Sequence, residues 1–386
     1  MIAYKKTWLD NLFIQQQCGQ MLDRDCIATK EMENISVAYP AGFYTPHFFI
    51  RCGLFLLSII ICLFSFGLIC LLFLNAIEKS ITGLVIFFSF VAYGTLEVMV
   101  RNKNHYRSGV TEALIWTAAG ALFSGISFAI NATGLTNSIL LFIITTYFVL
   151  RFADPLSSLA AFISVLGILF YTCLQFGFIG KAIAPFAIMA GGTIVYFLVV
   201  KKLQNREAFK HYADCLLVVE IASLVMIYAA GNYFMVRETS NALFGMQLPE
   251  DASIPFGWLF WIFTAAIPLL YITVGLRKKD SVLIRVGLVL VAAIVCTVKY
   301  YHSVAPIEVT MSVVGAALMF VSWFLIKWLK TPKHGFTYET IGEESFAAKQ
   351  FEAIVIAETF SSIPAPDTAT EFGGGSFGGA GAGNDY

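Results

Sequence analysis

One uncharged apolar run constrains this chain more than any other feature. Residues 52–74 follow Arg51 and contain no charged side chain over 23 consecutive positions. A helix of that length measures about 34 Å, which exceeds the ~30 Å hydrocarbon core of a bilayer. Because 47 mostly polar residues precede position 48, we interpret 48–74 as a membrane-spanning helix and not as a signal peptide, whose apolar run would lie closer to the N-terminus.

The composition extends this interpretation to the whole chain. Hydrophobic residues make up 58% of the sequence and charged residues only 13%, whereas soluble domains carry about 25% charge. Lys plus Arg and Asp plus Glu number 25 each, so the charge balance gives no indication of a nucleic-acid partner. The eight cysteines form no CxxC pair, which argues against a disulfide or zinc framework. The lipid bilayer is the one partner that the composition predicts, and protein partners are unknown.

Nine more apolar segments follow the first. They occupy residues 80–100, 109–130, 137–152, 155–176, 181–200, 215–236, 258–276, 281–301 and 306–329. The segment 137–152 is the shortest, at about 24 Å of helix, and a re-entrant hairpin made with 155–176 would keep both ends of the chain on one side. The sequence predicts an all-α, polytopic transmembrane helix bundle of about 10 spans, with eight spans and a hairpin as the alternative.

Lysine and arginine indicate the orientation, because cytoplasmic loops carry an excess of both. With the N-terminus inside, 18 of these residues fall in inside segments and 4 in outside loops. The alternation holds at every loop except near 137–152, where Arg151 balances Lys181. Both termini are therefore predicted to be cytoplasmic.

Polar segments flank the predicted bundle on both sides. The chain divides into a cytosolic helical head over 1–47, the transmembrane bundle over 48–330, a cytosolic tail with a short amphipathic helix over 331–363, and a disordered glycine-rich tail over 364–386. The head contains two short amphipathic stretches, one of which includes Trp8, Leu9 and Leu12. These helices are expected either to pack together or to lie on the bilayer surface.

Charged residues within the spans are the best candidates for a site, because each costs about 2.5–3.5 kcal/mol at a helix centre and is usually kept for a reason. Glu220 lies roughly 9 Å into its span and is the leading candidate. A predicted inward-facing polar cluster comprises Glu220, Glu97, Arg285, Glu112, Arg151 and Asp154. Within it, the positions allow either Glu220 or Glu97 to pair with Arg285. On the outer side, the positions of Lys299 and Glu308 allow a second pair.

These charges allow three roles. Ion pairs that only hold helices together are favoured, a transport or proton pathway comes next, and catalysis comes last. The five histidines lie in loops or at span ends, and no HExxH motif is present. Matches to GxSxG and GxGxxG fall in the glycine tail, which lacks the strand and helix that both motifs require. We therefore predict no catalytic, cofactor-binding or metal-ligating residue, and the sequence leaves enzyme activity open.

Four stretches of the chain resemble an uncharacterised bacterial family of polytopic inner-membrane proteins. They are YKKTWLDNLFIQQQ at 4–17, YPAGFYTPHFFIRCGLFLL at 39–57, RFADPL at 151–156 and EFGGGSFGG at 371–379. The resemblance implies a multi-pass protein of the cell inner membrane and brings no activity or site residues with it. The glycine tail is also similar to the end of bacterial TPM-domain membrane proteins, but the TPM domain is absent from this chain.

Two functions are consistent with these features. The first is transport of a small solute or ion through the inward-facing polar cluster. The alternative is a membrane scaffold or sensor that acts through its cytosolic head and tail.

Overall fold

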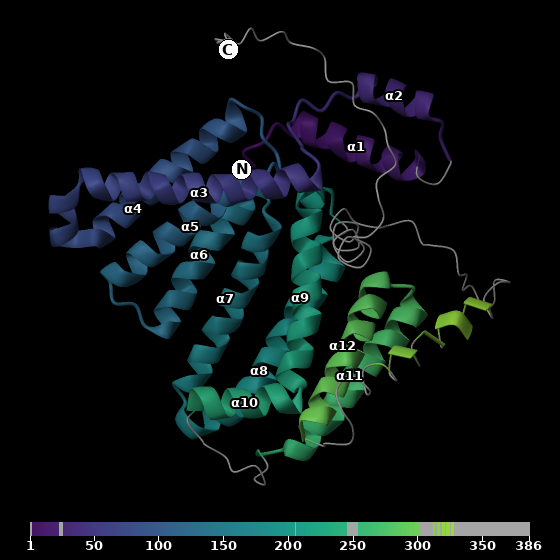
Figure 1. Cartoon of the computed structure of the whole chain (residues 1–386). Helices are drawn as coiled ribbons and strands as arrows, with labels where there is room; N and C mark the ends of the chain where they lie inside the picture. Colours follow the sequence, from purple (N-terminus) through teal and green to yellow (C-terminus); the bar gives the residue numbers. More distant parts are fainter. Residues whose placement is uncertain are drawn as a thin grey trace, which may run out of the picture. The chain divides into compact units, whose positions relative to one another are not determined.

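The computed structural model describes residues 2–22, 26–204, 206–244 and 254–301, with scattered residues between 312 and 327. Apart from an isolated bridge between Tyr44 and His105, the regular structure of this part of the chain is helical (Figure 1). The helices are α1 (Lys6–Leu22), α2 (Thr29–Ala38), α3 (Phe48–Leu72), α4 (Leu74–Arg101), α5 (Val110–Ala129), α6 (Gly134–Phe152), α7 (Pro155–Leu174), α8 (Gly177–Leu198), η1 (Val199–Leu203), η2 (Glu207–Tyr212), α9 (Ala213–Gly231), α10 (Tyr233–Phe244), α11 (Gly257–Lys278) and α12 (Ser281–Tyr301).

Within the described ranges, nine helices are long and apolar enough to cross a membrane. They correspond to the first nine predicted segments, and they confirm the prediction of an all-α polytopic membrane bundle. The tenth segment, 306–329, lies mostly outside the described residues. The predicted tail from 331 onward lies wholly outside them, as does Glu308.

The doubtful fourth span proves to be of ordinary length. α6 begins at Gly134 and not at position 137, and it contains 19 residues, or about 28 Å of helix. Its neighbour α7 contains 20 residues. Both helices are long enough to cross the hydrocarbon core, so the feature that suggested a re-entrant hairpin is not present.

The predicted end of the seventh span at 236 is wrong. α9 stops before Asn232 and α10 begins directly after it, because Asn232 is extended and its side chain takes the place of helical hydrogen bonds. The Asn232 Oδ1 accepts the Met235 N–H at 3.1 Å, and Nδ2 donates to the Tyr228 hydroxyl at 2.9 Å and to Thr297 at 3.0 Å. A short apolar run can therefore contain a helix break when a buried amide is fully hydrogen-bonded.

Four antiparallel helix hairpins make up most of the bundle. The pairs α4–α5, α6–α7, α8–α9 and α11–α12 pack most closely, and α7 also packs on α8 and α9. Each pair is joined on the side that the charge distribution predicts to be cytosolic. In the α6–α7 turn, Ala153 adopts a left-handed conformation, and the Asp154 carboxylate then caps α7 by accepting the Ser157 N–H at 2.7 Å.

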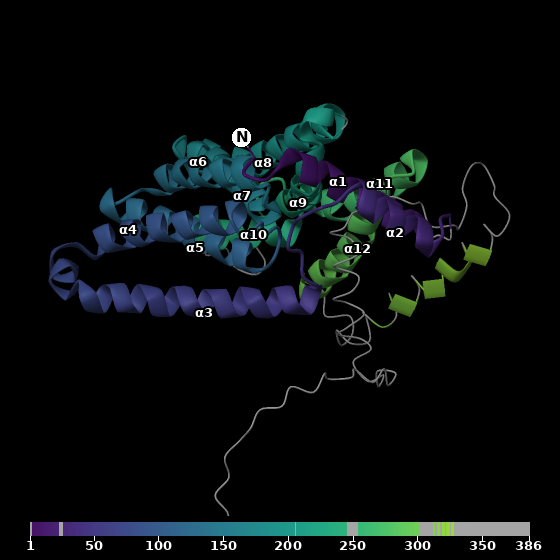
Figure 2. The same ribbon diagram turned by 90° about the horizontal axis from the view of Figure 1, so that it is seen from above.

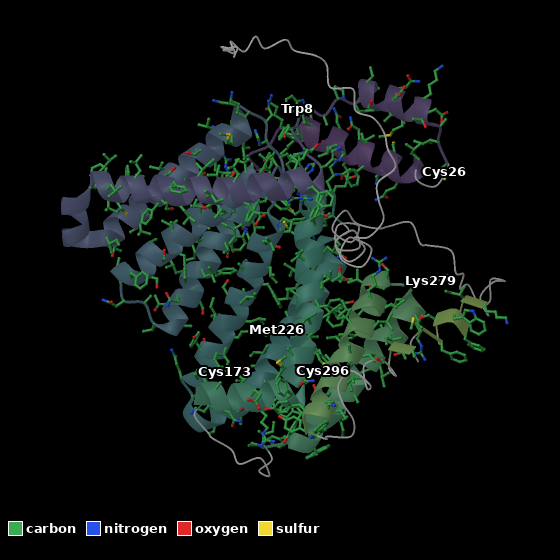
Figure 3. All side chains as sticks on the ribbon, in the orientation of Figure 1. Trp8, Cys26, Cys173, Met226, Lys279 and Cys296 are labelled. Carbon is green, nitrogen blue, oxygen red and sulfur yellow. The ribbon has the colours of Figure 1, made fainter. Side chains whose placement is uncertain are left out.

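The head packs against the ends of these hairpins. α1 and α2 pack on each other, as one of the two expected arrangements requires. Trp8, labelled in Figure 3, meets Phe43 edge-on with ring centroids 5.3 Å apart. Tyr4 and Leu9 are buried in the same core cluster as residues of α4, α5 and α6. The Ala3 N–H also donates to the Arg151 carbonyl oxygen at 2.8 Å. The head is therefore part of the folded unit.

The contacts of the head test whether the head and the hairpin connections lie on the same side of the bundle, as the predicted number of spans requires. The segment before α3 hydrogen-bonds to the α4–α5 connection through Tyr44 and Asn104 (N to O, 3.1 Å). The Asp10 carboxylate pairs with Lys210 in the α8–α9 connection (2.7 Å). The head, two of the hairpin connections and the end of α6 thus lie on one side, as the alternation of charge requires.

α3 lies at the edge of this group of helices, against α4 and α5 (Figure 2). Its contact with α5 depends on Gly109, which has a φ of 88°. A Cβ atom there would lie 2.1 Å from the Arg51 carbonyl oxygen and 2.9 Å from the Phe55 nitrogen. Glycine is therefore required at this position for two reasons, its positive φ and the close approach of the α3 backbone.

We predict that Gly109→Ala separates α3 from α5. The strained φ alone costs about 1–3 kcal/mol, and the overlap with Arg51 adds to this cost. Thermal unfolding of the purified protein in detergent should show a clear loss of stability. The matched control is Gly94→Ala on α4, where no atom lies within 4 Å of the added Cβ. Equal melting temperatures for the two variants would contradict the packing of α3 described above.

Candidate functional site

The site is centred on Glu97, one turn before the end of α4. Tyr93 and Arg101 lie four residues before and after it, so all three side chains share one face of the helix. α6 brings Tyr147 and Arg151 to the same place, and these two residues are also four positions apart. The predicted cytosolic ends of two helices from different hairpins thus converge on one carboxylate.

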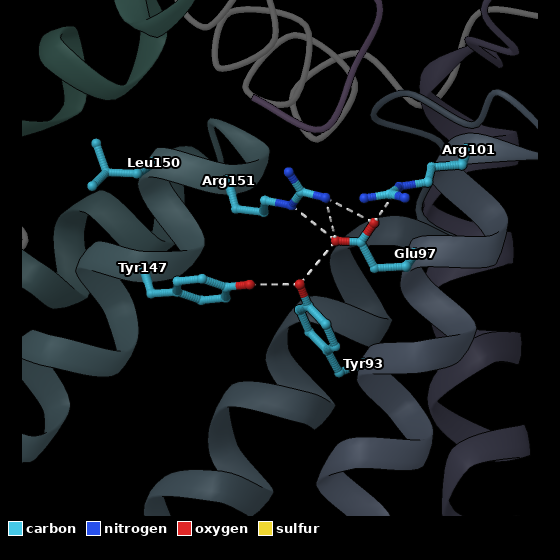
Figure 4. Close-up of a pocket in the computed structure, with 6 residues that line it drawn as sticks. All are labelled: Tyr93, Glu97, Arg101, Tyr147, Leu150 and Arg151. Atoms are coloured by element: carbon cyan, nitrogen blue, oxygen red, sulfur yellow. Dashed lines mark hydrogen bonds and ion pairs between the residues drawn. The ribbon is translucent and has the colours of Figure 1, made fainter. Parts of the chain in front are cut away.

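The Glu97 carboxylate accepts hydrogen bonds from three side chains (Figure 4). Arg151 binds it in a bidentate manner, Nε to Oε1 at 2.8 Å and Nη2 to Oε2 at 3.0 Å. Arg101 Nε lies 2.8 Å from Oε2, and the Tyr93 hydroxyl donates to Oε1 at 2.8 Å. The hydroxyls of Tyr93 and Tyr147 are 2.5 Å apart. Bidentate arginine–carboxylate pairs are among the strongest polar contacts in proteins.

These residues line a cavity of about 630 Å³. The lining residues are Tyr93, Glu97, Arg101, Tyr147, Leu150 and Arg151. Two guanidinium groups and one carboxylate leave a formal charge of +1. The Arg101 side chain is 62% exposed, whereas those of Glu97 and Arg151 are 16% and 21% exposed. Arg151 therefore fixes the carboxylate, and Arg101 can still reach a ligand. The arrangement suits an anionic group of modest size.

The structure changes the pairing that the sequence predicted for Glu97. The sequence allowed Arg285 on α12 to pair with either Glu97 or Glu220, but Glu97 pairs with Arg151 and Arg101. The prediction assumed that depth in the membrane selects the partner. Depth alone does not determine which helices are neighbours, and α6 is the helix that reaches Glu97.

Glu220 has a different environment from the one expected. It is only 3% exposed, on α9, and it accepts a hydrogen bond from the Gln204 amide after η1. Glu220 does not line the α4–α6 cavity, and its bonding partner is an amide, not Arg285.

Glu112 and Asp154 have structural contacts. Glu112 forms an ion pair with Arg51 of α3, and its Oε2 accepts the Gly109 N–H at 2.7 Å. It therefore both caps α5 and holds α3 in place. Asp154 caps α7, as described above. Both arrangements match the ion-pairing and capping role of charged groups near an interface.

Several residues of the site were not identified from the sequence. Tyr93 and Tyr147 carry no charge, and a search for ionisable residues within spans passes over them. Arg101 was counted only as a loop charge. The spacing of Tyr93, Glu97 and Arg101 at every fourth position was the available signal, because it places all three on one helix face.

A second set of charges connects the head and the loops on the same side. Arg107 of the α4–α5 connection forms an ion pair with Asp214 at the start of α9. Asp10 of α1 faces Lys210 at 2.7 Å and His211 at 3.4 Å. The hydrogen bond and charge of Lys210 lower the pKa of the Asp10 carboxyl below its usual value. The group is partly exposed, so this contact is expected to stabilise docking of α1 by no more than ~1 kcal/mol.

We predict that docking of α1 weakens in acid. Because the docked Asp10 has the lower pKa, its contribution is present above the undocked value of about 3.9 and is lost as the pH falls through the docked value. At pH 7, Asp10→Asn should increase amide exchange in α1 by up to about fivefold. The control is Glu33→Gln on α2, an exposed carboxylate with no ion pair among the described residues. Unchanged exchange in Asp10→Asn would contradict this role.

Comparison of the chain with known proteins adds no assignment. Models of protein families, curated proteins and solved structures were all compared with it, and none matches. What can be said of its function therefore rests on the residues and contacts described above.

Proposed function

We propose that this chain is a multi-pass protein of a bacterial cytoplasmic membrane that transports a small solute or ion. In this proposal, the cavity between α4 and α6 is its binding station on the cytosolic side. The excess of lysine and arginine in the predicted inside segments supports the orientation. The resemblance to bacterial inner-membrane proteins supports the location.

The observation that carries the proposal is the unequal charge of the cavity. Two arginines share the one carboxylate of Glu97, in a space of about 630 Å³. A pair of equal and opposite charges would need no ligand. A surplus positive charge with an exposed guanidinium attracts an anion. The expected substrate is therefore a small anion, or a solute that carries an anionic group.

This proposal moves the substrate site from Glu220, the leading candidate of the sequence, to the cluster around Glu97. Glu220 is 3% exposed and already hydrogen-bonded to Gln204. Glu97, Arg101 and Arg151 line an open cavity. A transported ligand must reach its site from water or lipid, so the accessible cluster is the better candidate.

The docking of the head favours a second candidate, a sensor. The Ala3 N–H binds the carbonyl oxygen of Arg151, whose side chain lines the cavity, and the adjacent Tyr4 is only 7% exposed. A ligand that shifts Arg151 would also disturb the hydrogen bond between Arg151 and Ala3, and so the docking of the head. In such a sensor, ligand binding would change how the head presents itself to cytosolic partners.

Transport can be tested before the substrate is identified. Proteoliposomes on a solid-supported membrane would be exposed in turn to inorganic phosphate, phosphate monoesters and carboxylates, and charge movement would be recorded. At least one class should give a transient current, and Arg151→Gln should reduce it at least tenfold. The milder Tyr147→Phe, which removes one hydroxyl from the cavity, should weaken it while keeping the fold.

The matched control is Arg277→Gln, which removes an exposed arginine in the last turn of α11. It should conduct like the native protein, because it lies outside the cavity. Native currents in a folded Arg151→Gln protein would contradict the proposed station. The absence of a current with every anion class would contradict transport itself.

A further inference from the structure

We propose that the ligand of the α4–α6 cavity carries a phosphate and that its source is an anionic phospholipid of the cytosolic leaflet. In this arrangement, Arg101 and Arg151 hold the phosphate, and an acyl chain lies along α6. The inference rests on the proposed function, because it identifies the solute with an anionic group that this cavity is proposed to bind.

The cavity lies on an exposed apolar side of α6. Ile139, Ile143, Tyr147 and Leu150 are exposed by 42%, 60%, 48% and 42%. Their spacing places them along one face of the helix, and the last two line the cavity. In a membrane-spanning helix, an exposed apolar face of this kind meets acyl chains. The cavity therefore continues directly into a lipid-facing surface.

α4 contributes a similar surface from the other side. Phe90 is 63% exposed and lies about two turns from Glu97 on the same face of the helix. The rise from Ile143 to Arg151 is about 12 Å, which is shorter than an acyl chain. An amphiphile that places its phosphate on the arginines could therefore lay its chain between Phe90 and Ile143.

The charge of the cavity is opposite to that of a phospholipid headgroup. The cavity carries a formal +1, and a phosphate diester carries one negative charge. Arg101 uses only Nε on Glu97, and its terminal nitrogens have no partner among the described residues. Those N–H groups can form the parallel pair of hydrogen bonds that arginine makes with phosphate.

The two arginines lie at the depth of lipid headgroups. Arg101 is the last residue of α4, and Arg151 is the second to last residue of α6. Both belong to the predicted cytosolic ends of their helices, where anionic headgroups lie. Basic pockets between helices at this level favour anionic headgroups. A soluble anion would gain the same contact with arginine but nothing from the exposed apolar stripe.

The test measures which lipid stays with the protein. The full chain would be placed in nanodiscs of phosphatidylcholine and phosphatidylglycerol in equal amounts, and lipid retained after detergent exchange would be quantified by native mass spectrometry. The native protein should retain phosphatidylglycerol selectively. Arg101→Gln should lower this retention about fivefold, the effect of removing one arginine from an anionic lipid surface. Because Arg101 is largely exposed, this variant is expected to fold. Arg277→Gln is the matched control, and equal retention in the two variants would overturn the proposal.

A second pair of measurements separates the two sources of phosphate. Ile143→Ser, which disrupts the apolar stripe and leaves both arginines, should lower phosphatidylglycerol retention. Glycerol phosphate at millimolar concentration should displace little of the lipid. Full displacement by glycerol phosphate, with no effect of Ile143→Ser, would assign the cavity to a soluble phosphate and overturn the lipid source.

The results of the two experiments together tell the failures of the two proposals apart. Selective lipid retention without any anion-driven current would contradict transport and leave the lipid site in place. Currents that depend on Arg151, together with no lipid selectivity, would overturn the lipid inference alone.

Discussion

A charge in hydrocarbon is tolerated when an opposite charge satisfies it, and the ion pairs of this chain follow that constraint. Arg51 binds Glu112, Arg151 binds Glu97, and Arg107 binds Asp214. Each pair joins helices or connections that are distant in sequence. The pairs lie near the predicted cytosolic side, where water access lowers the cost of each charge. Because each charge requires a partner, these ion pairs help to determine which helices are neighbours at that side.

Glu97 is the member of this set that also lines the cavity between α4 and α6. It binds a second arginine, Arg101, and the surplus charge borders a cavity instead of being neutralised. The same residues are close to the head, through the Ala3 contact with the Arg151 backbone. They also adjoin the exposed apolar face of α6. The proposed binding of an anion, the proposed contact with lipid and the docking of the head therefore meet at the end of α6.

The span architecture could be predicted from sequence because hydropathy and charge are properties of each segment alone. Nine predicted segments correspond to nine long apolar helices among the described residues. The break at Asn232 was missed because one asparagine hardly changes the hydropathy of a window. It becomes visible only when the Tyr228 and Thr297 hydroxyls that satisfy it are known.

The candidate site was predicted only in part. Glu97 and Arg151 were named, but their mutual pairing was not, because helical periodicity assigns residues to faces and says nothing of which faces meet. Similar depth allowed either Glu220 or Glu97 to pair with Arg285, and the structure gives Glu220 a Gln204 partner. The role of Gly109 also depends on where the Arg51 backbone lies. The local sequence pattern around Gly109 does not predict that position.

The most direct test of this account is a double-mutant cycle on the pair at its centre. Unfolding free energies in detergent would be measured for Glu97→Gln, Arg151→Gln and the double variant. If the pair fixes the ends of α4 and α6, its coupling free energy should be about 1–3 kcal/mol, and the double variant should be more stable than the sum of the single losses implies. Strictly additive losses, with a coupling near zero, would contradict the central place given to this ion pair.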